Sequence, residues 1–180
     1  LDTANIKSSS SDVGGIAGKM NWGTASKLEV TNASITGSKE VGGIVGYASA
    51  ESTLTIEQAV FNGNVYGSYS GGIIGYPNYT KVNISNSYTT GYSKVAGISG
   101  YKANSISNCY TTMKVGSYPI AVVSDNTEGV FWNSSTAGVS SSRYGTPKTT
   151  GELQQASTFA GWDTSIWNIE DGKYPTLKWE

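Results

Sequence analysis

Side chains that could carry out acid-base, nucleophilic or metal chemistry are few and scattered in this chain. Histidine is absent from the 180 residues, which removes His-dependent triads and His-containing metal sites. A single cysteine, Cys109, excludes an internal disulfide and a Cys-based zinc site. Polysaccharide-cleaving enzymes gather carboxylates beside a basic residue, but Arg143 is the only arginine and lies outside the repeats described below. The aspartates never recur at a repeated offset: Asp2, Asp12, Asp125, Asp163 and Asp171. We therefore expect no catalytic residue, no cofactor and no metal.

Three tyrosines, Tyr47, Tyr76 and Tyr101, end copies of one short motif and could form a row on one face. Such a row, with Lys19 at one end, could bind a glycan or a partner strand through flat apolar contact. In the alternative, which we favour, the tyrosines pad a corner of the fold and cover the next turn. The ligand-binding row is kept as a hypothesis.

The motif itself is a glycine-marked repeat. Four segments share the pattern Gly-Gly-Ile-x-Gly or a close variant of it, at 13–19, 41–47, 70–76 and 95–101. Their isoleucines, Ile16, Ile44, Ile73 and Ile98, are 28, 29 and 25 residues apart. A phosphate-binding loop would need a strand before it and a helix after it, once per site. Four copies in phase indicate close stacking of backbones instead, and we expect the four isoleucines to stack inside.

A second phase of each copy alternates apolar and polar residues, as in Leu54-x-Ile56-x-Gln58. Period-two alternation predicts strands. By the same alignment, we expect Gln58 to stack at one bend with Asn32, Asn86 and Asn108, as a ladder of hydrogen-bonded amides. The spacing also places Ile120 in a degenerate fifth copy at 118–124.

No unit of 25–29 residues can bury its own apolar face, whereas stacked copies form one continuous core. We therefore predict an all-β fold in which residues 1–138 form a parallel β-helix, or solenoid, of about five coils. Coils of this kind are spaced about 4.8 Å apart.

The composition changes after Gly138, and residues 139–180 are predicted to form a C-terminal cap packed with the repeats as one domain. A linker comes first, followed by a capping box at Thr149 and Glu152. A short helix through Leu153 and Phe159 should end near Gly161. The Trp-rich remainder is predicted to cover unpaired strand edges at the end of the stack.

The repeats resemble the GLUG motif family of bacterial surface proteins, named for segments such as Gly43-Ile-Val-Gly46. The segment from Trp162 to Trp179 looks like the one that often closes such arrays. The resemblance covers nearly the whole chain, with Ala96 and Lys19 as departures from the pattern. It implies secretion, a stacked β fold, and occurrence in adhesins and in non-catalytic regions of IgA-specific metallopeptidases.

On this basis we expect a non-enzymatic module of a bacterial cell-surface or secreted protein, whose partners are glycans, host proteins or neighbouring domains. A passive stalk that presents another domain is the alternative, and a β-helical carbohydrate-active enzyme is a third.

Twelve basic and thirteen acidic residues give a charge of −1 without a basic stripe, which disfavours a nucleic-acid partner. No stretch approaches the apolar length of a membrane span. Because the chain starts Leu1-Asp2-Thr3, we expect an excised or processed segment.

Overall fold

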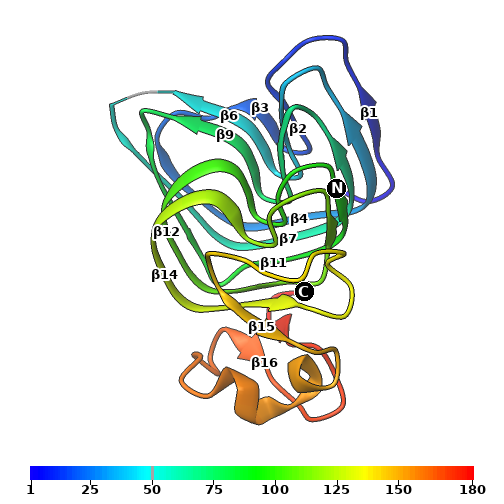
Figure 1. The fold of residues 1–180 in the computed structure, drawn as a ribbon. Helices are drawn as coiled ribbons and strands as arrows, with labels where there is room; N and C mark the ends of the chain where they lie inside the picture. Colours follow the sequence, from blue (N-terminus) through cyan, green and yellow to red (C-terminus); the bar gives the residue numbers. More distant parts are fainter. Residues whose placement is uncertain (50) are drawn as a thin grey trace.

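The computed structural model describes residues 1–49 and 51–180, and these residues form an all-β structure without an α-helix (Figure 1). The all-β prediction is confirmed. No helix of the described residues is long and apolar enough to cross a membrane. The strands are β1 (Asn5–Lys7), β2 (Val13–Gly14), β3 (Ala17–Lys19), β4 (Gly23–Thr36), β5 (Glu40–Gly42), β6 (Val45–Ser49), β7 (Thr53–Tyr66), β8 (Tyr69–Gly71), β9 (Ile74–Asn78), β10 (Lys81–Ser85), β11 (Tyr88–Ser93), β12 (Ser99–Thr111), β13 (Lys114–Val115), β14 (Ala121–Asn133), β15 (Thr146–Lys148), β16 (Trp167–Asn168) and β17 (Thr176–Leu177).

Equivalent strands of successive copies pair in parallel. Strand β4 pairs β7, β7 pairs β10 and β11, both of these pair β12, and β12 pairs β14. The motif strands do the same, because β3 pairs β6 and β6 pairs β9. In Figure 1 the chain returns to nearly the same place with each copy, so that segments far apart in sequence lie side by side. Antiparallel pairing joins only β16 and β17 among the described strands.

The motif isoleucines form a hydrogen-bonded ladder. The amide of Ile16 donates to the carbonyl of Ile44 at 3.0 Å, and that of Ile44 to Ile73 at 3.1 Å. The ladder continues from Ile73 to Ile98 at 3.0 Å and from Ile98 to Ile120 at 2.9 Å. Glycine is needed beside it, because a Cβ at Gly72 would collide with the carbonyl oxygen of Gly97.

Burial along this ladder differs between its end and its middle. Ile44, Ile73 and Ile98 are fully buried, but Ile16 is 48% exposed. The prediction that Ile16 lies inside is therefore wrong. The physical reason is that β2 and β3, which flank Ile16, are edge strands with no described strand on their outer side.

The second phase of the first copy is shifted from the predicted alignment. Ala25, not Val30, pairs with Ile56, and Val30 pairs with Phe61. A register shift between Val30 and Ala33 then places Asn32 on a bulge, where its amide donates to Asp2 at 2.9 Å. Asn32 thus does not belong to the predicted amide ladder. The bulge holds one extra residue, since two residues stand between Val30 and Ala33 and only one between Phe61 and Gly63, and the apolar pattern alone did not reveal it.

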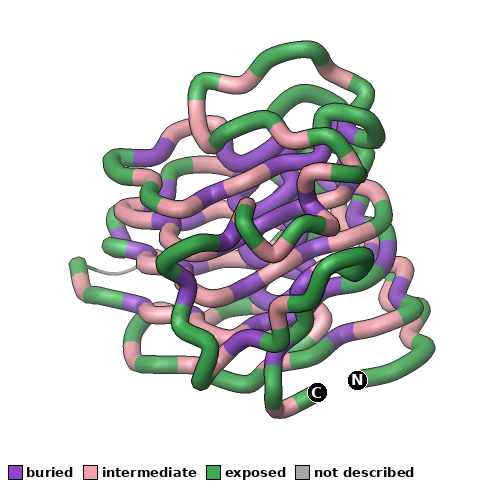
Figure 2. The backbone as a smooth tube through the Cα atoms, turned by 90° about the horizontal axis from the view of Figure 1, so that it is seen from below, coloured by how far each residue is buried: buried purple, intermediate pink, exposed green. Residues whose placement is uncertain are grey.

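The core runs along the inside of the stacked copies. Leu54 and Ile56 of β7 face Val82 and Ile84 of β10, and all four are fully buried. Figure 2 shows the buried segments running through the middle of the molecule and the exposed segments on its outside. Alternation within each strand therefore sends every second side chain into the core.

The C-terminal segment contains two short 3₁₀ helices, η1 (Glu152–Gln154) and η2 (Ala156–Phe159), in place of the predicted continuous helix. The predicted capping box is present, since the Thr149 amide donates to the Glu152 carboxylate at 2.7 Å and the Glu152 amide to the Thr149 hydroxyl at 3.2 Å. Gln155 has extended backbone angles and interrupts the helix between the two turns. A single capping motif over so few residues does not sustain an α-helix.

The end of the stack and its side are covered by different parts of this segment. The predicted linker covers the end: Val139 and Tyr144 pack against the main core, and β15 pairs in parallel with β14. The Trp-rich remainder lies against the side of the stack, on outward-facing residues of β7, β11, β12 and β14. The expectation that the tryptophans cover the strand edges is therefore wrong.

Tyr110 is the centre of this side contact. It pairs with Tyr88 and Phe131 on either side, so that aromatic rings from three successive copies form one surface. Its hydroxyl donates to the carbonyl of Pro175 at 2.7 Å. The tail buries the following side chains against that surface: Leu153, Phe159, Trp162, Trp167 and Leu177.

Candidate ligand-binding face

The three predicted tyrosines lie together on the outside of the motif strands, on β6, β9 and β12. Tyr47 and Tyr76 stack with ring centroids 6.1 Å apart and planes 15° apart. Tyr76 and Tyr101 stack more closely, at 4.4 Å and 17°. The ammonium of Lys19 lies 5.2 Å from the Tyr47 ring centroid, as a cation–π contact at one end of the row. All three tyrosines are half-buried.

The orientation of these rings limits what they can bind. Because the rings are nearly parallel and stacked on one another, Tyr76 has one face against Tyr47 and the other against Tyr101. Tyr69, which the sequence did not single out, places its ring against Tyr76 edge to face at 4.6 Å. A ligand therefore meets ring edges and hydroxyl groups at Tyr76, and the flat apolar contact of the hypothesis is not available there. Burial raises the pKa of the Tyr76 hydroxyl, which favours its neutral form as donor and acceptor.

The residues of the predicted amide ladder share a left-handed backbone conformation in successive copies. Gln58, Asn86 and Asn108 have φ of 52°, 48° and 49°, and Lys27 with 54° and Gly129 with 59° occupy the equivalent places in the first and last copies. The side chain of Asn86 bonds outside the ladder, because its oxygen accepts from Trp167 Nε1 at 3.2 Å. These residues shape a corner of the fold and link it to the tail.

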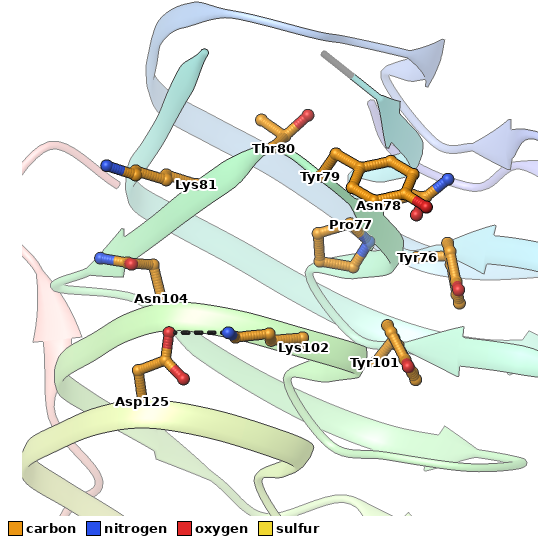
Figure 3. Close-up of a pocket in the computed structure, with 10 residues that line it drawn as sticks. All are labelled: Tyr76, Pro77, Asn78, Tyr79, Thr80, Lys81, Tyr101, Lys102, Asn104 and Asp125. Atoms are coloured by element: carbon orange, nitrogen blue, oxygen red, sulfur yellow. Dashed lines mark ion pairs between the residues drawn. The ribbon is translucent and has the colours of Figure 1, made fainter. Parts of the chain in front are cut away.

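A hollow opens beside the tyrosine row, between the turn after β9 and the strands of the next two copies (Figure 3). In the third copy, β9 ends at Asn78 and β10 begins at Lys81, so the chain turns outward at 79–80. In the fourth and fifth copies, β12 and β14 run through the equivalent region without interruption. The hollow is the step between this projecting turn and the flat strands beside it.

Tyr79 is the most exposed aromatic residue of the described chain and stands at the rim of this hollow. The residue is 82% exposed, and its backbone φ is 60°. A left-handed backbone is unfavourable for a bulky residue, so this turn is strained. The turn is held from both sides, since Asn78 donates to the Tyr47 hydroxyl at 3.2 Å and the Lys81 amide to the Ser52 carbonyl at 2.9 Å.

Polar groups form the opposite wall. The Lys102 ammonium and the Asp125 carboxylate form an ion pair at 3.0 Å, and both side chains are about half exposed. The side chain of Asn104 donates to Asn83 at 3.0 Å and also lines the hollow. Figure 3 shows Lys102 and Asp125 joined by their ion pair on the lower strands, below the turn that carries Tyr79 and Thr80.

The ionisable groups elsewhere differ from those of a catalytic centre. Hydrogen bonds lower the pKa of Asp2, Glu152 and Asp163, whereas a general acid requires a raised one. Burial raises the pKa of the Cys109 thiol to about 12, which keeps it in its unreactive protonated form. The described residues hold no group of three or more acidic or cysteine side chains that could bind a metal ion.

Tyr79 and the hollow were not among the sites predicted from the sequence. The available signal was the connection from the motif isoleucine to the next buried aliphatic, which spans 11 residues from Ile73 to Ile84 and 8 from Ile98 to Ile106. Where a longer connection lies beside a shorter one, the longer one projects from the surface and leaves a hollow next to it. Comparison of the chain with family models, with curated proteins and with solved structures returns no match.

Proposed function

We propose that residues 1–138 form a five-coil parallel β-helix of the GLUG type, within a bacterial protein that acts outside the cell. The support is the ladder of motif isoleucines from Ile16 to Ile120 and the in-register parallel pairs of β7, β10 and β12. Like residues then follow one another along a single axis, as in repeat solenoids. The sequence resemblance supplies the surface location.

The function that we propose for this module is non-enzymatic binding of a glycan or a host surface protein, as part of an adhesin-like molecule. One observation carries it: the outer face of the motif strands bears a row of tyrosines, and the hollow with exposed Tyr79 lies directly beside that row. Aromatic residues next to convergent polar groups are typical of binding surfaces.

A passive stalk is the second candidate, and the stacking of the tyrosines favours it. Ring faces that are occupied by one another contribute to the fold rather than to a ligand. A stalk and a binding module differ in one respect: residues beside the hollow matter only to the binding module.

Display of the full chain on a non-adherent bacterium, fused to a heterologous anchor, tests the proposal. Adherence to host cells is compared with that of the anchor alone and of an anchor fused to an inert repeat of similar length. Adherence above both controls is the expected result. Adherence equal to that of the inert repeat would contradict binding and favour the stalk.

A further inference from the structure

We infer that the hollow between the 79–80 turn and strands β12 and β14 is a saccharide site, in which a sugar ring lies against the exposed ring of Tyr79. The inference deepens the proposed function and rests on it, because it names the ligand class of a binding module. It moves the site away from the row of Tyr47, Tyr76 and Tyr101, whose ring faces are occupied.

The first support is an exposed aromatic ring on a turn that hydrogen bonds hold in place. Tyr79 is 82% exposed, and its ring contacts no other aromatic ring of the described chain. The turn is fixed on one side by Asn78 and on the other by Lys81. A backbone fixed in this way loses little conformational entropy when the ring that it carries binds a ligand.

The second support is the strain of the turn. A glycine would adopt φ of 60° without penalty, yet a tyrosine occupies the position. Burial of its side chain does not offset the free-energy cost of this strain, because the side chain projects into solvent. Strained residues that the fold does not need are typical of functional sites.

The third support is the chemistry of the opposite wall. Lys102, Asp125 and Asn104 place an ammonium, a carboxylate and an amide beside one another, and these groups donate to and accept from hydroxyl groups. Adjacent sugar hydroxyls present donors and acceptors of this kind on one edge of a ring that also has an apolar face.

The charge of the hollow argues against the other ligand classes. Asp125 pairs with Lys102 at 3.0 Å, and Lys81 is the one other cation among the described lining residues, so the hollow lacks the series of cations that nucleic acid requires. An apolar peptide anchor would need a deep apolar pocket, whereas the hollow is open and lined by polar and apolar groups together.

The test is a glycan array probed with the full chain, followed by calorimetry on the strongest oligosaccharide with purified variants. Tyr79→Gly removes the ring and relieves the strain, so we expect binding at least about tenfold weaker while the melting temperature stays equal or rises. Tyr79→Phe keeps the ring and should bind within about threefold of the wild type, because the stacking contact remains. Lys102→Met should weaken binding by removing a donor.

Trp22→Ala is the matched control, since Trp22 is also highly exposed, at 73%, but does not line the hollow. It should leave the affinity unchanged. If the chain binds an oligosaccharide and Tyr79→Gly binds it equally well, this site is wrong while the proposed function stands. If no glycan is retained by the wild type, the saccharide assignment is overturned, and adherence of the displayed chain decides the proposed function separately.

Discussion

Gln58 within β7 and Asn86 directly after β10 occupy equivalent places in neighbouring copies and share a left-handed backbone, with φ of 52° and 48°. Each follows directly after a paired residue, Glu57 and Ser85 respectively. A left-handed residue reverses the alternation of side chains, so that the strand turns a corner and continues with a new inward face. The corner recurs in every copy, and this recurrence keeps the strands on both sides of it in register.

Replacing Gln58 with glycine should stabilise the protein by up to about 1 kcal/mol, because glycine adopts the left-handed conformation without steric cost. The change in the urea midpoint measures the effect. Thr55→Gly on the same strand is the control and should destabilise by roughly 0.5–1 kcal/mol, since its backbone is an ordinary strand. A Gln58→Gly variant as unstable as Thr55→Gly would show that the corner is not left-handed.

The isoleucine ladder predicts a contrast between two chemically identical substitutions. Ile73→Ala removes a fully buried side chain in the middle of the stack and should cost about 2–5 kcal/mol. Ile16→Ala removes one that is 48% exposed and should cost less than about 1.5 kcal/mol. Chemical denaturation of both variants measures the difference. Equal losses would contradict the position of Ile16 at an uncovered end.

The contact between the tail and the stack should weaken in alkali. Burial raises the pKa of Tyr110 well above its ordinary value of 10.0, and its hydroxyl donates to the Pro175 carbonyl. In the unfolded chain the same group ionises near pH 10, so the folded state retains a proton that the unfolded state loses. The stabilisation that this group contributes should therefore be constant with pH below about pH 10 and should fall as the pH rises above that value.

Tyr110→Phe isolates this effect. The variant should be less stable than the wild type by about 1 kcal/mol at pH 8, because the Pro175 carbonyl loses its donor. Between pH 9 and pH 11 it should lose less stability than the wild type does, as measured by urea midpoints. Parallel curves for Tyr110→Phe and the wild type would contradict a buried, protonated Tyr110.

Cys109 should resist thiol reagents in the folded protein. The thiol is fully buried, its pKa is raised to about 12, and its sulfur lies 3.1 Å from the carbonyl of Ser107. Modification by a disulfide reagent at pH 8 should therefore proceed only at the rate of unfolding. Cys109→Ser should cost less than about 1 kcal/mol, since Ser87 makes the same contact with Ser85 in the preceding copy. Rapid labelling of the native protein would contradict this burial.

The periodic features of the fold could be predicted because each copy repeats the same physical requirement. Glycines next to Ile44 and Ile73 are needed wherever two backbones approach closely, and the fifth copy at Ile120 follows from the spacing even without its glycines. The C-terminal capping box at Thr149 was likewise predictable, because its hydrogen bonds are local.

The features that were mispredicted depend on contacts that the repeat does not encode. Asn32 has the residue type and the left-handed backbone of the ladder, but the bulge before Ala33 moves it out of register. The tail tryptophans pack on Tyr110 because aromatic residues of three copies coincide on one face, which requires the register to be known first. The place of Tyr79 depends on its exposure and on its left-handed backbone, neither of which the repeat pattern encodes.

Distance measurement between spin labels at Thr24 and Asn126, in a Cys109→Ser background, tests the stacking of copies most directly. Thr24 pairs with Thr55, Thr55 with Asn83, Asn83 with Ser105, and Ser105 with Asn126. Four steps at the spacing of paired strands place the two backbones about 19 Å apart, although 102 residues separate them in sequence. One narrow distribution near that value, widened only by the label linkers, is the predicted result. A broad distribution, or one centred beyond about 35 Å, would contradict stacking in register, because four parallel-strand spacings cannot span it.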